Sequence, residues 1–193
     1  MFTHPPPRRR RLMGAVVVAV ATLVLVVTGL FAFGGSGRKP AGTSTSPTAF
    51  ALPRLSGPGL VRLADFHGRP VVVNFFASWC TACDFELPGF AHVSTELQGE
   101  VTFVGVDSLE TGDPGYMPTR HHITWWPLAR DIGGANGSGL HDALGGGSGM
   151  PMTAFYDSGG KLLAVQRGAL PEDALRTEIT QLYGIPTATR PGS

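Results

Sequence analysis

The chain has 193 residues, of which 42% are hydrophobic, enough for one folded domain with additional segments outside it. Its net charge of +1 combines two unlike regions. Residues 1–39 contain six basic and no acidic side chains, and the rest of the chain contains nine basic and 14 acidic ones. The part able to fold is mildly acidic, which argues against a nucleic-acid partner.

The N-terminal region has the pattern of a membrane anchor. Residues 1–11 are rich in Pro and Arg and are expected to be disordered. Residues 12–33 carry no charge and would form a helix about 33 Å long, enough to cross a hydrocarbon core of about 30 Å. Four arginines precede this span, so the positive-inside rule puts the N-terminus in the cytoplasm and later residues outside.

A cleaved signal peptide is the alternative to this anchor, because a weak small-residue site lies near residues 32–34. A lipoprotein anchor is excluded, because no cysteine follows the apolar span at a suitable position. Residues 34–49 are rich in Gly, Ser, Thr and Pro and are predicted to be a flexible linker. We therefore expect a single-pass cell-membrane protein with an extracytoplasmic domain at 50–184 and a disordered tail at 185–193.

Hydrophobic patterning and turn residues predict the elements of this domain. A strand that begins at Val71 reads as buried on both faces, and a short strand at 60–63 and a turn at 65–70 precede it. After it we expect a helix over 84–98 that Pro88 should kink, a buried strand at 101–106, a short helix at 117–122 and a strand or extended piece at 123–128. A brief helix at 139–144, a hairpin of strands 152–156 and 162–167, and a helix at 171–183 should follow.

This order of elements predicts an α/β domain. The crossover after the first buried strand should return parallel to it, whereas the hairpin strands pair antiparallel. We therefore expect a central mixed β-sheet flanked by helices.

Cys80 and Cys83 are the only cysteines of the chain, and they follow the buried strand and open the predicted helix. Unpaired N–H groups and a partial positive charge at a helix N-terminus favour a thiolate over a thiol. Cys80 lies at the open helix end and is the expected attacking thiolate. Cys83, one turn further and more shielded, would resolve the mixed disulfide. The pattern predicts a redox-active dithiol.

Two other uses of the cysteine pair are disfavoured. Half of a zinc site would need further ligands, but there is no second Cys-x-x-Cys and His121-His122 lack ligand-like spacing. A purely structural disulfide would close too small a loop to stabilise the fold much. We expect neither a metal nor a cofactor.

Three separated stretches carry a family resemblance. They are residues 63–80, which end in Ala-Ser-Trp-Cys, residues 83–88, Cys-Asp-Phe-Glu-Leu-Pro, and residues 149–155, Gly-Met-Pro-Met-Thr-Ala-Phe. In these stretches the chain resembles the thioredoxin fold and, more narrowly, the membrane-anchored extracytoplasmic oxidoreductases of the TlpA/ResA-like group. The resemblance covers residues 50–184.

The resemblance implies roles for the dithiol and for one acid. Cys80 would be the nucleophile and Cys83 its resolving partner. Glu86 would assist proton transfer at Cys83, because Asn74 stands where thioredoxin has a buried aspartate. The alternative for Glu86 is an exposed first-turn acid that stabilises the helix end.

The resemblance also implies a substrate-binding surface beside the dithiol. Pro151 would be a cis-proline, and the backbone of Met150 would pair with the bound substrate. Trp79 would shield the dithiol, although a plain packing role fits equally well. These three residues complete the predicted site.

Two residues depart from the family pattern. Ala82 stands where a proline usually precedes the second cysteine, and Phe76 replaces a tryptophan. The residues between the cysteines strongly affect redox poise, so a reducing potential is not inherited from the family. Residues 133–149 also look like an insertion. His67, His92 and His141 have no partner pattern, and His121-His122 is expected on a solvated helix.

The resemblance implies a membrane-tethered thiol–disulfide oxidoreductase that reduces disulfides in extracytoplasmic proteins, for example apocytochrome c during cytochrome c maturation. A transmembrane thiol carrier would then restore the dithiol. The alternatives are an oxidant that donates disulfides to secreted proteins and a redox-inert thioredoxin-fold binding module. A peroxidase is disfavoured, because the chain lacks the Pro-x-x-x-Thr-x-x-Cys pattern of the related peroxide-reducing family.

Overall fold

The computed structural model describes residues 43–133 and 139–187. The predicted basic N-terminus, the predicted anchor at 12–33 and most of the predicted linker lie outside the described residues, as does the end of the predicted tail. Within the part that is described, no helix is long and apolar enough to cross a bilayer.

The centre of the domain is a five-stranded mixed sheet with the strand order β5-β4-β3-β6-β7. These strands are β3 (Val71–Phe76), β4 (Thr102–Ser108), β5 (Leu128–Asp131), β6 (Met152–Tyr156) and β7 (Leu162–Arg167). Strand β3 pairs parallel with β4 and antiparallel with β6, and β6 and β7 form the antiparallel hairpin. The predicted mixed sheet, parallel crossover and hairpin are confirmed.

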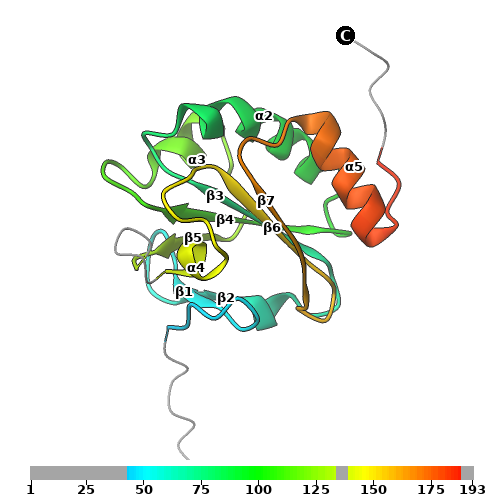
Figure 1. Ribbon diagram of the computed structural model, residues 1–193, viewed down its shortest axis with the longest axis horizontal. Helices are drawn as coiled ribbons and strands as arrows, with labels where there is room; N and C mark the ends of the chain where they lie inside the picture. Colours follow the sequence, from blue (N-terminus) through cyan, green and yellow to red (C-terminus); the bar gives the residue numbers. More distant parts are fainter. Residues whose placement is uncertain (1–42, 134–138, 188–193) are drawn as a thin grey trace, which may run out of the picture. The chain divides into compact units, whose positions relative to one another are not determined.

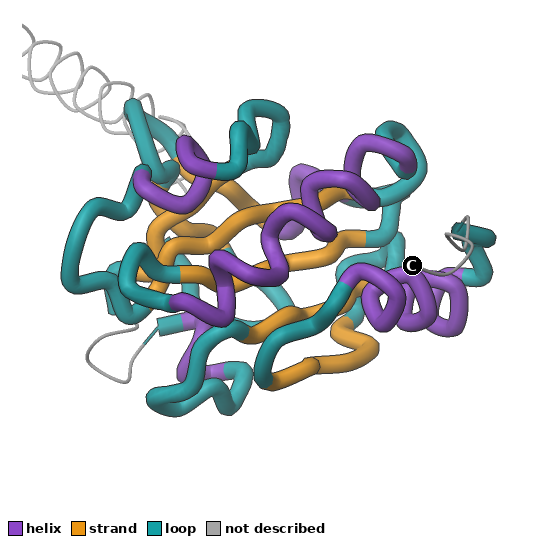
Figure 2. The backbone as a smooth tube through the Cα atoms, turned by 90° about the horizontal axis from the view of Figure 1, so that it is seen from above, coloured by secondary structure: helices purple, strands orange, loops and turns teal. Residues whose placement is uncertain are grey.

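Strand β3 is buried along its whole length because both sheet faces are covered. Val72 and Phe76 belong to a cluster with α2 (Thr81–Glu96), α3 (Tyr116–Arg120) and α5 (Glu172–Tyr183). Val71, Val73 and Phe75 point the opposite way, toward β1 (Ala51–Pro53), β2 (Leu60–Arg62), the 3₁₀ helix η1 (Leu63–Phe66) and α4 (Leu140–Ala143). Figure 1 shows these two layers on either side of the sheet, and Figure 2 looks down onto the sheet with helices crossing in front of the strands. The alternation follows from the two-residue period of a strand.

Several predicted boundaries were wrong. Residues 63–66 form η1 where we expected a strand end and a turn, and β1 was missed because three residues carry too little pattern. Helix α2 begins at Thr81 with Cys80 as its N-cap, as the Cys-x-x-Cys pattern predicted, and it continues through Pro88 to Glu96, two residues short of the predicted end. The predicted extended piece at 123–128 is a strand only from Leu128, where β5 begins.

Contacts continue a few residues beyond the predicted domain limits. The Ser44 and Ala51 backbones form two hydrogen bonds of 2.7 and 2.8 Å. At the other end, Ile185 packs against the cluster on the α2 face. The folded part of the chain therefore includes residues on both sides of 50–184.

Candidate active site

Cys80 and Cys83 form a disulfide at the N-terminus of α2. Cys80 is the N-cap residue, and the Cys83 backbone N–H donates to its Sγ atom at 3.0 Å. This contact is of the kind that stabilises a thiolate once the disulfide is reduced. Cys80 is 3% exposed and Cys83 is fully buried, so both sulfurs are largely covered in the oxidised state.

Glu86 follows Cys83 by three residues on α2 and points into the protein, where only 2% of it is exposed. Its Oε1 accepts a hydrogen bond from Asn74 Nδ2 and its Oε2 accepts one from the Leu170 N–H, both at 2.7 Å. Burial raises the pKa of Glu86 to about 7, although both hydrogen bonds oppose this shift. The alternative of an exposed helix-end acid was therefore wrong. A carboxyl group that titrates near neutral pH suits proton transfer.

The peptide bond between Met150 and Pro151 is cis, as the resemblance implied. Pro151 directly precedes β6, and Met152 of β6 pairs with Phe75 of β3. Because β6 runs antiparallel to β3, its start lies at the sheet edge where β3 ends and the chain continues to Cys80 (Figure 1). Met150 also packs against the cluster that contains both cysteines. The fold thus brings the dithiol and the Met150-Pro151 loop together.

Trp79 is not a core residue, because 47% of it is exposed. Its indole N–H donates to the Leu109 carbonyl at 2.8 Å, which attaches the side chain to the loop after β4. Phe85 on α2 and Tyr116 on α3 are also exposed aromatic side chains. The plain packing alternative for Trp79 is therefore disfavoured.

Two histidine predictions need correction. His121 is not solvated: its side chain is 12% exposed and its Nε2 lies 2.7 Å from Asp84 Oδ1. Arg120 donates to the same oxygen at 2.6 Å and, with His121, lowers the pKa of Asp84. Since Asp84 directly follows Cys83, this cluster joins α3 to the first turn of α2.

His141, to which the sequence assigned no role, is buried in α4 behind the cis-proline loop. Its Nε2 lies 2.9 Å from the Gly149 carbonyl, one residue before Met150, so the ring carries its proton on Nε2 there. The Leu140 and His141 backbone N–H groups donate to Asp131 at 2.8 Å. The described part of the predicted insertion therefore supports the loop that carries Pro151.

We expect Gly146→Ala to destabilise the protein, because the new Cβ would overlap the buried His141 ring. Overpacking of this kind costs about 1–3 kcal/mol and sometimes more. Urea unfolding would measure the loss. Gly149→Ala is the matched control, because its Cβ meets only the Gly146 carbonyl at 3.5 Å. Equal stability of the two variants would contradict the prediction.

Glu110 belongs to none of the sequence motifs, yet it hydrogen-bonds Ser78 just before the dithiol. A signal was available, because Glu110 closely follows β4, the parallel neighbour of β3. The carboxyl ends of parallel neighbours meet at one sheet edge. The sequence did not predict that Glu110 would contact Ser78.

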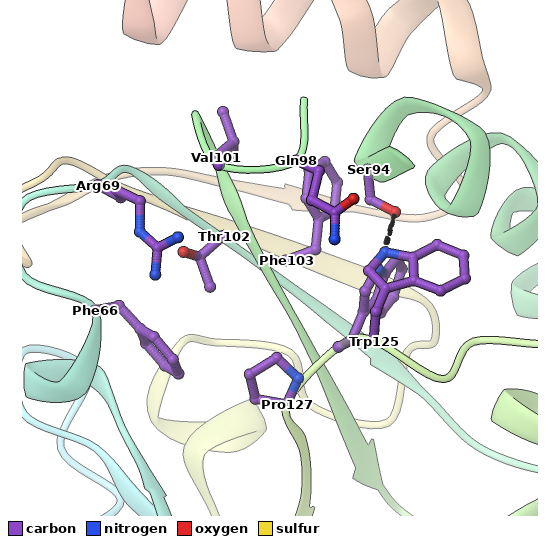
Figure 3. Close-up of a pocket in the computed structure, with 11 residues that line it drawn as sticks. Phe66, Arg69, Ser94, Gln98, Val101, Thr102, Phe103, Trp125 and Pro127 are labelled. Carbon is purple, nitrogen blue, oxygen red and sulfur yellow. Dashed lines mark hydrogen bonds between the residues drawn. The ribbon is translucent and has the colours of Figure 1, made fainter. Parts of the chain in front are cut away.

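A separate hollow of about 220 Å³ lies at the opposite sheet edge, where β3 and β4 begin. Figure 3 shows that aromatic side chains, Arg69 and Thr102 line it. The Trp125 and Trp126 indoles both donate to Ser94 Oγ, at 3.2 and 2.9 Å. This packing explains why residues 124–127 form no strand. Among residues 43–133 and 139–187, no three His, Cys, Asp or Glu side chains gather as possible metal ligands.

Comparison with known proteins shows which family and which relatives the chain resembles. The AhpC/TSA family model matches residues 45–125, which include β3, the dithiol and β4. Thiol-disulfide oxidoreductase ResA of Oceanobacillus iheyensis is 29% identical over 118 residues, which are 60% of this chain and 58% of ResA. Thiol:disulfide interchange protein DsbE of Pseudomonas fluorescens biotype C is 27% identical over 138 residues, 70% of this chain and 72% of DsbE. The chain is therefore similar to the AhpC/TSA family over residues 45–125 and to thioredoxin-like thiol–disulfide oxidoreductases of the ResA and DsbE type.

A solved structure shows the fold of the chain. The structure of MTB dsbF in its mixed oxidised and reduced forms superposes with a TM-score of 0.59 at 25% identity, over 73% of this chain and 99% of dsbF. The chain therefore has the thioredoxin fold, and these relatives belong to the TlpA/ResA/DsbE group that the three motifs indicated. It spans 58% of the ResA relative's length.

Proposed function

We propose that this protein belongs to the AhpC/TSA family and is a thiol–disulfide oxidoreductase that exchanges disulfides with other proteins. The observation that carries the proposal is the bonded Cys80–Cys83 pair at the N-terminus of α2, at the same sheet edge as the cis-Pro151 loop. The names of the ResA and DsbE relatives, both of which state thiol–disulfide chemistry, support it.

Reduction of a substrate would begin from the dithiol form. The Cys80 thiolate attacks one sulfur of the substrate disulfide, forms a mixed disulfide and releases the other substrate sulfur as a thiolate. Cys83 loses its proton and attacks Cys80 Sγ, which releases the second substrate thiol. Two electrons have then moved to the substrate, and the protein holds the Cys80–Cys83 disulfide seen here.

Glu86 is the proposed acceptor of the Cys83 proton. It lies three residues further along α2, on the same side of the helix as Cys83. Hydrogen bonds from Asn74 and Leu170 hold both carboxylate oxygens, and a pKa of about 7 leaves the group able to accept and return a proton near neutral pH. The exposed Trp79 and the Met150-Pro151 loop would contact the substrate polypeptide.

We place the domain outside the cytoplasm, tethered to the membrane by the apolar span at 12–33. Its partners would be disulfide-containing extracytoplasmic proteins, with apocytochrome c as a candidate, and a transmembrane thiol carrier would return electrons to Cys80 and Cys83. The uncharged span, the four arginines before it and the resemblance to the TlpA/ResA-like group support this assignment.

A disulfide-donating oxidant is the second candidate. The observation that favours it is Thr81-Ala82 between the cysteines, which lacks the usual proline. The dithiol of an oxidant is the more stable state, so its oxidised form should unfold at a lower temperature than its reduced form.

The equilibrium reduction potential of the purified full chain in a glutathione buffer separates the two directions. We expect a value near or below about −270 mV, as in thioredoxin, which fits a reductase supplied from the membrane. A value near about −120 mV, as in strong oxidants, would reverse the proposed direction. Failure to cycle between dithiol and disulfide would instead indicate a redox-inert binding module.

A further inference from the structure

The loop after β4 is attached to the segment that leads into Cys80. Glu110 Oε2 accepts a hydrogen bond from the Ser78 backbone N–H at 2.7 Å, and its Oε1 accepts one from Ser78 Oγ at 2.6 Å. One residue earlier, the Leu109 carbonyl accepts the Trp79 indole N–H at 2.8 Å. Three hydrogen bonds therefore hold the two residues that directly precede Cys80.

The loop is shaped for this contact. Glu110 Oε1 also accepts from the Thr111 and Gly112 N–H groups, which fixes the carboxylate on its own loop. A Cβ at Gly112 would lie 2.6 Å from Ser78 Oγ, so glycine permits this approach. Leu109 has a φ of +53°, which is uncommon for a residue other than glycine. Backbone and side chains of the loop are thus both arranged around Ser78.

Asp107 of β4 is 2% exposed, and its carboxyl group interacts with the carboxyl group of Glu110. Burial raises the pKa of Asp107 to about 8, and the Glu110 carboxylate adds to the shift. Burial also disfavours ionisation of Glu110, but the bonds from Ser78 outweigh it and lower the pKa of Glu110 to about 2. The two shifts run in opposite directions, so the pair favours an ionised Glu110 beside a protonated Asp107. Arg130, 3.7 Å from Asp107, and Asp113 are the other charged groups that act on Asp107.

We propose that Glu110 is a positioning residue for the dithiol, a role that rests on the proposed exchange function. The Glu110 carboxylate holds Ser78, and the carbonyl of the adjoining Leu109 holds Trp79. Together they keep Cys80 at the N-terminus of α2 when the disulfide opens. Reduction removes the covalent link between Cys80 and Cys83, and the position of Cys80 then depends on the residues before it. The Glu110 carboxylate is bonded to Ser78, which lies two residues before Cys80 in the sequence. Its negative charge therefore disfavours the Cys80 thiolate.

The test uses the reduced full chain with Glu110→Gln. Glutamine cannot accept at both oxygens, so the bond to the Ser78 N–H is lost and the charge is removed. We expect the midpoint of Cys80 alkylation by iodoacetamide to move to lower pH. We also expect the Trp79 indole N–H, followed by NMR and assigned with Trp79→Phe, to exchange with solvent about tenfold faster.

Two further variants separate charge from positioning. Asp113→Asn removes an exposed acid of the same loop, whose carboxylate accepts from the Gly115 N–H and not from Ser78. It should leave both readouts at the wild-type value. Ser78→Ala keeps the Glu110 charge and the backbone bond, so it should speed Trp79 exchange without moving the alkylation midpoint to lower pH. It also tests the proposal if Glu110→Gln does not fold.

The proposal is overturned if Glu110→Gln and Ser78→Ala both leave Trp79 exchange unchanged, or if Asp113→Asn shifts the alkylation midpoint as much as Glu110→Gln does. Neither readout needs a protein substrate. A wild-type chain that fails to exchange disulfides with proteins would therefore defeat the proposed function and leave the effect of Glu110 on Cys80 measurable.

Discussion

Changing Cys80 to serine is expected to lower the rate of protein disulfide reduction by about a thousandfold or more. The mixed disulfide needs a sulfur at the open end of α2. The only other sulfur nucleophile is Cys83, which is fully buried in the first turn. Turnover of a model protein disulfide with a chemical reductant, measured for wild type and Cys80→Ser at equal concentration, checks this.

Cys83→Ser provides the matched control. It keeps the attacking thiol of Cys80 but removes the resolving one, so the mixed disulfide with the substrate should accumulate and be visible by mass spectrometry. A Cys80→Ser chain that retained a tenth of wild-type turnover, or a Cys83→Ser chain that formed no mixed disulfide, would contradict the assigned roles.

Glu86→Gln is expected to slow turnover at neutral pH by about a hundredfold, the lower end of what a general acid–base group contributes. The glutamine keeps the size of the side chain but cannot take the Cys83 proton. The fold should tolerate it, because Leu170 still has an acceptor and the buried Asn74 Oδ1, which has no partner, gains a possible donor. The pH dependence of turnover should lose the component near pH 7. An unchanged profile would exclude Glu86 from proton transfer.

The same variant changes stability in a defined direction. The pKa of Glu86 rises from 4.5 to about 7 on folding, so between these values the folded chain binds more protons than the unfolded one. Stability of the wild type should therefore fall as pH rises through this window, by about 3 kcal/mol from this group. Asp107 contributes a similar decrease in both proteins, so the wild type should lose about 3 kcal/mol more than Glu86→Gln between pH 4.5 and 7 in urea unfolding. Equal losses in the two proteins would contradict the shifted pKa of Glu86.

Elements that carry their own pattern were predictable from the sequence. The buried run at Val71, the cysteines after it and the turn between β6 and β7 identify their structures locally, because strand burial, helix ends and turns depend on nearby residues. Short or irregular pieces were not predictable. Strand β1 exists because β2 pairs with it, and residues 124–127 stay irregular because two tryptophans bind one serine of α2.

The burial and the contacts of acidic side chains could not be predicted from the sequence either. The sequence left an exposed helix-end acid open as the alternative for Glu86. Its burial depends on Asn74 of β3 and Leu170 before α5, which are distant in the chain. Glu110 carries no sequence signal for its contact with Ser78, because loops that approach at a sheet edge leave no local periodicity.

The sequence by itself determined the mixed α/β sheet and the dithiol at a helix N-terminus, because each depends on contiguous residues and their spacing. The proline loop beside the dithiol was implied by the resemblance to a known family. The tertiary structure alone decided which acids are buried beside the dithiol, which residues hold Trp79 and how α4 supports the Pro151 loop. Burial and hydrogen-bond partners are properties of segments that meet only after folding, and they set the pKa values on which the chemistry of the site depends.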